Sequence, residues 1–223
     1  MTHTVSPSLS AALSETARDL RAARREALDA IDVEETEWEY AGRTWSWPAG
    51  EARTYFHELA PAEKSVLADM TATHDIEVIG VGTGRVAVEL PTETGLGDTD
   101  GAEQPQMIAK LARYGPSAEM GDGRPQNRRE QQVWEAVADH PFLPVLSAAD
   151  EGAWIAMPRA TVPPPPAERE TAMDRVRDAL AAHDDRFHFD ELKPENVGAY
   201  DGRYWIVDYG RPPGDPLFVD PPC

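Results

Sequence analysis

Acidic, basic and amide side chains near the C-terminal end of the chain have the types and spacing of a phosphoryl-transfer site. An acid stands at Asp190 or Glu191, followed by Lys193, Asn196 and Asp208. Transfer of a γ-phosphoryl group needs Mg²⁺ held on the phosphates and a hydroxyl aimed in line with the leaving group. Carboxylate and amide oxygens are suitable ligands for Mg²⁺. We therefore predict that Asn196 and Asp208 hold the metal and that the acid before them orients a hydroxyl.

The sequence around these residues resembles the protein-kinase-like superfamily, whose catalytic loop reads H-R-D-L-x-x-x-N and whose metal loop reads D-F-G. LKPEN at 192–196 and DYG at 208–210 stand in the corresponding places. Counting back from the asparagine, the position of the catalytic aspartate falls on Glu191, and Asp190 lies one residue earlier. Either the loop has an inserted residue and Asp190 serves, or Glu191 replaces it. The resemblance implies that Lys193 neutralises charge developing on the transferred phosphoryl group.

A solvated acidic hairpin is the alternative interpretation of this stretch. Asp201-Gly202 lies between two apolar runs, which is a hairpin signal by itself. Upstream, RFHF at 186–189 is expected to be the strand that delivers the catalytic loop.

Further back, the segment EVIGVGTGRVAVEL at 77–90 carries Gly80, Gly82 and Gly84 between two β-rich runs. Glycines at such a turn let backbone amides approach a phosphate without an intervening Cβ. The kinase pattern at this place is G-x-G-x-x-G-x-V, and here the third glycine comes one residue early, with Arg85 in its place. A plain hairpin is the alternative.

Lys110 ends the apolar run MIAK at 107–110, which resembles the V-A-I-K strand of kinases. The resemblance implies that its ammonium contacts the α and β phosphates and pairs with a glutamate of the next helix. In the helix expected over 127–140, Glu130 shares a face with the apolar Val133 and Trp134, so it should point inward, with Glu135 as the fallback. The alternative for the lysine is an edge-strand side chain in water. Asn127 is the expected N-cap of the helix.

Two further β-runs, 142–148 and 152–160, resemble the last strands of a kinase small lobe. The resemblance places Met157 at the back of the nucleotide pocket. It makes 158–161, including Arg159, the hinge whose backbone meets the adenine.

Helices and a hairpin are expected on either side of this region. A helix over 8–31 is expected, because its apolar residues recur at three- and four-residue steps and so share one face; this face could pack on a partner, but packing on its own chain is the favoured interpretation. Trp38, Tyr40, Trp45 and Trp47 alternate around Gly42, which predicts a short hairpin that is either core or a binding platform, with core favoured. Short helices are expected over 51–59 and 61–70. Another helix is expected over 167–183, after a stiff proline run.

Composition excludes several classes of protein. The 223 residues carry 40 Asp and Glu against 21 Lys and Arg, a net charge of −19, which argues against nucleic acid or an anionic membrane as a partner. Scarce lysine with excess acid resembles the proteins of extreme halophiles. The sole cysteine, Cys223, excludes an internal disulfide and a Cys-based metal site. Without a long apolar run or a signal pattern, we expect a cytoplasmic protein.

These observations together predict an α+β, kinase-like two-lobe fold. We expect a helical N-terminal extension over 1–73, a small antiparallel-sheet lobe over 74–162, and a minimal C-terminal lobe over 163–223, because little chain follows Gly210. The resemblance implies a phosphotransferase that uses ATP and Mg²⁺ on a small molecule or a partner's hydroxyl. The alternative is an inactive pseudokinase, of viral or mobile-element origin, that serves as a nucleotide- or protein-binding module.

Overall fold

The computed structural model describes residues 5–31, 35–40, 43–50, 54–55, 58–91, 106–116, 121–136, 141–182 and 192–210. Over these ranges the chain is mixed α+β, with the helices α1, α3, α4 and α5 and a five-stranded antiparallel sheet, so the predicted α+β class is confirmed. The chain divides into two compact units. The first comprises Met1–Asn127 and Leu146–Arg159, and the second comprises Arg128–Val145 and Ala160–Cys223.

Helix α1 runs from Pro7 to Asp29 in the first unit. Its start is fixed by Ser6, whose Oγ accepts a hydrogen bond from the Leu9 N–H at 3.4 Å, and by proline at the first helical position. Its apolar face is buried in the core of its own chain, which confirms the predicted packing of this helix. The buried residues include Leu9, Leu13, Ala17 and Leu20.

Helix α3, Pro61–His74, confirms the helix predicted from residue 61 and extends one turn beyond it. The carboxylate of Glu63 accepts a hydrogen bond from the Ala60 N–H at 2.9 Å, which satisfies one of the amides at the start of the helix. The helix ends where Asp75 takes a left-handed conformation with φ 53°. Most of the helix predicted over 51–59 lies outside the described residues.

The sheet of the first unit has the order β3-β4-β5-β7-β6, with every neighbouring pair antiparallel. Its strands are β3 Glu77–Val81, β4 Arg85–Glu89, β5 Met107–Ala112, β6 Ser147–Ala148 and β7 Trp154–Pro158. The strand predicted over 142–148 is therefore mostly wrong. Pro144, within the predicted run, lacks the N–H that a strand ladder needs.

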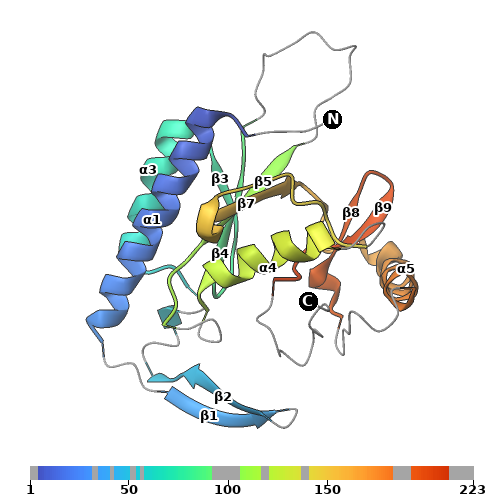
Figure 1. The fold of residues 1–223 in the computed structure, drawn as a ribbon, viewed down its shortest axis with the longest axis horizontal. Coiled ribbons are helices and arrows are strands. Elements are labelled where there is room, and N and C mark those ends of the chain that lie inside the picture. Colours follow the sequence, from blue (N-terminus) through green and yellow to red (C-terminus); the bar gives the residue numbers. More distant parts are fainter. Residues whose placement is uncertain are drawn as a thin grey trace. The chain divides into compact units, whose positions relative to one another are not determined.

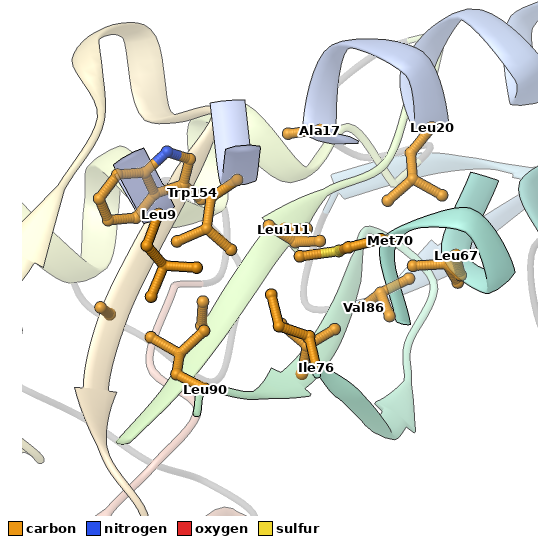
Figure 2. Close-up of a cluster of buried hydrophobic side chains, with 14 residues drawn as sticks. Leu9, Ala17, Leu20, Leu67, Met70, Ile76, Val86, Leu90, Leu111 and Trp154 are labelled. Atoms are coloured by element: carbon orange, nitrogen blue, oxygen red, sulfur yellow. The ribbon is translucent and has the colours of Figure 1, made fainter. Parts of the chain in front are cut away.

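Helices α1 and α3 lie side by side on one face of this sheet (Figure 1). Figure 2 shows side chains from both helices and from the strands meeting in one cluster, among them Leu20, Met70 and Leu111. Burying a side chain of this size stabilises the fold by about 1.5–3 kcal/mol. The indole Nε1 of Trp154 donates to Ser14 Oγ at 2.9 Å, so its one polar atom is satisfied inside the core.

The second unit contains helix α5 and a β-hairpin that pack together (Figure 1). Helix α5 is Arg169–Ala181, which confirms the helix predicted there, and the strands are β8 Val197–Tyr200 and β9 Arg203–Ile206. The turn residues Asp201 and Gly202 have φ 49° and 68°, the left-handed pair that favours a tight hairpin.

The remaining elements are a second hairpin and helix α4. Strands β1 Glu35–Tyr40 and β2 Arg43–Pro48 pair antiparallel, as the sequence predicts. Helix α4 is Gly123–Ala136. None of the described helices is long and apolar enough to cross a lipid bilayer.

Candidate functional site

The hairpin of β8 and β9 brings the two predicted metal ligands to the same end of one element. A 3₁₀ turn, Pro194–Asn196, leads into β8, and Asp208 follows β9 by two residues. The Val207 N–H donates to the carbonyl oxygen of Asn196 at 2.9 Å, which extends the ladder by one step. The backbone therefore places Asn196 and Asp208 together at the open end of the hairpin, with Asn196 half-buried and Asp208 exposed.

Tyr209 fixes the backbone on the C-terminal side of Asp208. Its side chain is fully buried, its hydroxyl donates to the carbonyl of Leu143 at 2.6 Å, and its ring lies 4.8 Å from that of Phe142. Its N–H donates to Glu130 Oε1 at 3.2 Å. The residue after the predicted metal ligand is thus held by a ring contact and by hydrogen bonds from both its main chain and its side chain.

Glu130 is fully buried, as its place on the helix face predicts. Its carboxylate lies beside Asp208-Tyr209-Gly210, because Tyr209 donates to it. Glu135, the fallback, is exposed and accepts from Gln131 Nε2 at 2.9 Å on the helix surface. Of the two glutamates, only Glu130 points inward.

Lys110 lies in the middle of the sheet. Its strand β5 pairs with β4 on one side and with β7 on the other, and the residue is 8% exposed. The alternative of an edge-strand lysine in water is therefore wrong. Lys110 belongs to the first unit and Glu130 to the second, so their predicted ion pair stays a prediction.

Asn127 is not the N-cap of α4, contrary to the sequence prediction. The helix begins at Gly123, and Asp122 Oδ1 accepts from the Arg124 N–H at 2.9 Å. Asn127 lies one turn inside the helix and is fully buried. Its Nδ2 donates to the carbonyls of Lys110 at 3.1 Å and Gly152 at 3.0 Å. The side chain thus fastens the strand that carries Lys110, and only its neighbours in the fold reveal that role.

The predicted phosphate-binding glycines lie at the β3–β4 connection, where the Gly82 N–H donates to the Arg85 carbonyl at 2.8 Å. Gly82 is exposed, and Gly80 is half-buried on β3. Gly84 is buried, and a Cβ there would lie 2.7 Å from Gln126 Nε2. A larger residue at position 84 would therefore require the end of the Gln126 side chain to move, and the phosphate contacts of the turn stay a prediction.

A buried ionic cluster beneath this turn has no sequence signature. Arg113 is fully buried and forms a two-pronged pair with Glu63, from Nε to Oε1 and from Nη2 to Oε2, both at 2.8 Å. Its Nη1 donates to the Gly82 carbonyl at 2.7 Å, and Arg24 Nη1 donates to the Thr83 carbonyl at 2.6 Å. Burial, together with the charge of Arg113, lowers the pKa of Arg24 to about 9, so Arg24 stays protonated at neutral pH.

The predicted hinge spans the boundary between the two units, which falls after Arg159. The Arg159 N–H donates to the Gln106 carbonyl at 2.7 Å, its guanidinium pairs with Glu89, and the Thr161 N–H donates to the Ala199 carbonyl at 2.9 Å. Proline at 158 has no N–H. The adenine contact of this segment stays a prediction, and it would use the amide of residue 160 or carbonyl oxygens. Met157, on β7, is fully buried.

The two candidates for the acid, Asp190 and Glu191, lie outside the described residues, as does the strand predicted over 186–189. Lys193 is exposed and directly precedes the 3₁₀ turn that contains Asn196. Within the described part of the chain, no group of three or more His, Cys, Asp or Glu side chains is arranged to hold a metal. The metal-binding role of Asn196 and Asp208 stays a prediction, and two protein oxygens would need phosphate oxygens beside them to hold Mg²⁺.

Comparison with models of known protein families finds no match. Comparison with curated proteins finds none either.

Proposed function

We propose that this chain is a kinase-like phosphotransferase with a two-lobe fold, which binds ATP with Mg²⁺ and transfers the γ-phosphoryl group to a hydroxyl of a small molecule or a partner. The observation that carries the proposal is the hydrogen bond from the Tyr209 N–H to Glu130. It joins the helix glutamate and the D-Y-G segment, two motifs of the resemblance that are separated by 79 positions in sequence.

Asn196 and Asp208 are the residues that would hold Mg²⁺. They supply one amide and one carboxylate oxygen from the same end of a hairpin, which fits a cation that binds through one or two protein oxygens and the phosphates. When bound, the metal neutralises charge on the phosphates. Lys193, exposed just before Asn196, would stabilise the transferred group, and Asp190 or Glu191 would accept the proton of the acceptor hydroxyl.

Lys110 is assigned to the α and β phosphates, with Glu130 as its ionic partner. Support for the lysine comes from its place in the centre of the sheet, because an ammonium that is almost fully buried is costly without a nearby negative charge. Support for the glutamate comes from its complete burial on α4.

The first test is the melting temperature in molar KCl with and without Mg²⁺-ATP. Ligand at a hundred times its Kd stabilises the folded state by about 2.7 kcal/mol, which raises the melting temperature of a protein of this size by about 5–10 °C. Asp208→Asn should lose the Mg²⁺-dependent part of this rise. Asp201→Asn is the matched control, because Asp201 lies exposed at the other end of the same hairpin and should leave the rise unchanged.

Lys110→Met should also lose the rise, whereas Lys64→Met, an exposed lysine on α3, should keep it. The absence of any shift in the wild-type protein would rule out nucleotide binding and with it the proposed function.

A binding module without phosphotransfer is the second candidate. The packing of Gly84 against the Gln126 side chain favours this candidate. In a glycine-rich loop that covers a nucleotide, the corresponding glycine would be open to the ligand. The two candidates differ in turnover. If the chain is an enzyme, the double variant Asp190→Ala with Glu191→Gln should bind Mg²⁺-ATP like the wild type and lose phosphate transfer or slow ATP hydrolysis. Wild-type protein that binds Mg²⁺-ATP without either reaction would favour the module.

A further inference from the structure

We propose that Arg113 and Arg24 are positioning residues for the turn Gly82-Thr83-Gly84, and that helices α1 and α3 serve the nucleotide site by holding these arginines. The role rests on the proposed function, because it presumes that the turn meets phosphate. It assigns a task to the N-terminal region, for which the kinase resemblance supplies no counterpart.

Each of the three successive carbonyls of the turn accepts a hydrogen bond from one of the two arginines. The Gly82 carbonyl accepts from Arg113 Nη1 at 2.7 Å, the Thr83 carbonyl from Arg24 Nη1 at 2.6 Å, and the Gly84 carbonyl from the Arg113 N–H at 2.7 Å. These bonds fix the orientation of three consecutive peptide planes. Without them the glycines of the turn would leave those planes free to rotate.

Fixing the carbonyls also fixes the amides. In a trans peptide the N–H points opposite to the C=O of the preceding residue, and among the described residues the cis bond is that of Val162-Pro163. The N–H of Thr83 therefore points away from the Arg113 guanidinium, and the N–H of Gly84 points away from that of Arg24. Successive N–H groups with a set orientation are what a phosphate oxygen requires of a glycine-rich turn.

The arginines are themselves held by the N-terminal region. Arg24 lies on α1, and Arg113 is paired in two-pronged fashion with Glu63 of α3. Arg113 Nη2 also donates to the carbonyls of Tyr55 at 3.0 Å and Glu58 at 2.7 Å. A guanidinium that is fully buried and bonded to this many oxygens keeps one geometry, because any other arrangement would leave a charge unpaired in the interior.

The cluster also carries the charge that suits an anion. The charges that act on Arg24 include the carboxylates of Glu63 and Asp122 and the guanidiniums of Arg113 and Arg21, so this group of five side chains, three cationic and two anionic, carries a net positive charge. In a chain with a net charge of −19, such a local excess is a favourable place for phosphate.

The test is titration calorimetry in molar KCl with two probes, Mg²⁺-ATP and adenosine, on wild type and Arg24→Met. Loss of one hydrogen bond to the turn should weaken Mg²⁺-ATP binding by about five- to tenfold. Adenosine lacks phosphates, so its affinity should change by less than about twofold, as expected for a substitution that does not contact the ligand.

Arg18→Met is the matched control. Arg18 is exposed on the same helix, and its described ion pairs are with the neighbouring Glu15 and Asp19. The affinities of Arg18→Met for Mg²⁺-ATP and for adenosine should therefore be unchanged.

Arg24→Lys keeps a charge and a donor, so it should lose less affinity for Mg²⁺-ATP than Arg24→Met. It also provides a folded variant should Arg24→Met fail to fold. Hydrogen exchange of the Thr83 and Gly84 amides in the nucleotide-free proteins should be faster in the Arg24 variants than in Arg18→Met, because the peptide planes are released.

A loss of affinity that is equal for the two probes, or no loss at all, would overturn the positioning role. The proposed function would survive that result if wild type binds Mg²⁺-ATP and Asp208→Asn does not. Wild-type protein that binds neither probe would overturn both.

Discussion

At the scale of single residues, the candidate site depends on side chains that hold other residues in place. Asp208 is exposed and follows strand β9 by two residues. Tyr209 fixes the backbone on its C-terminal side through its buried ring, its hydroxyl and its main-chain N–H. The aromatic residue between the aspartate and the glycine is therefore an anchor for the segment that we predict to bind the metal.

The anchoring hydroxyl can be removed by itself. Tyr209→Phe should lower the free energy of unfolding by about 1–3 kcal/mol, because the buried Leu143 carbonyl loses its donor. The measurement is urea unfolding in molar KCl. Tyr204→Phe is the control, since the Tyr204 hydroxyl donates to the exposed Glu168 and its loss should cost less than about 0.5 kcal/mol. Equal effects in the two variants would contradict an anchoring role for Tyr209.

At the scale of elements, the first turn of α4 is pressed against the end of the glycine turn. A Cβ at Gly123 would lie 2.0 Å from the Gly84 carbonyl oxygen and 2.8 Å from the Ala112 Cα. Both are backbone atoms and cannot be rotated out of the way. The contact explains why glycine occurs at position 123, where the helix start meets the carbonyl of residue 84.

Gly123→Ala therefore reverses the usual effect of this substitution. In a helix, alanine is more favourable than glycine by about 0.8–1 kcal/mol. Here the clash should dominate, and we expect a loss of stability of about 1–3 kcal/mol in urea unfolding. Gly82→Ala is the control, because a Cβ there meets the Arg85 carbonyl at an ordinary 3.5 Å and the residue does not have positive φ. A stabilised Gly123→Ala would show that the helix start is not packed in this way.

At the scale of the whole molecule, we expect the surplus of acidic residues to make stability depend on salt. A net charge of −19 on 223 residues produces self-repulsion that the folded state must overcome. Screening shortens the range of this repulsion to about 3 Å at 1 M salt. The composition thus fits a protein that folds most stably in concentrated salt.

The melting temperature should accordingly rise steadily as KCl is raised from about 0.1 M to above 1 M, where the screening length becomes shorter than the spacing of surface charges. Sucrose is the control, because it favours the compact state without screening charge. It should raise the melting temperature at every KCl concentration and leave the increase between low and high KCl the same size. A melting temperature that stays constant or falls with added KCl would contradict the account of the acidic surface.

Local patterns in the sequence were sufficient to predict many of the elements. The hairpin at Asp201-Gly202, the amphipathic helix α1, the strand that ends near Lys110 and the inward direction of Glu130 all follow from turn chemistry or from periodicity over a few residues. Such signals are local because they depend on backbone geometry within one or two turns. The α+β class follows from the same patterns.

Tertiary structure alone decided how those elements are fastened together. The Arg113–Glu63 pair joins residues 50 positions apart, and Asn127 bonds the carbonyls of Lys110 and Gly152 rather than capping a helix. Gly84 is buried against α4, although its sequence context fits an open loop equally well. The physical reason is that a buried polar group takes whichever partners the packing brings within reach, and those partners are set by the fold rather than by the neighbouring sequence.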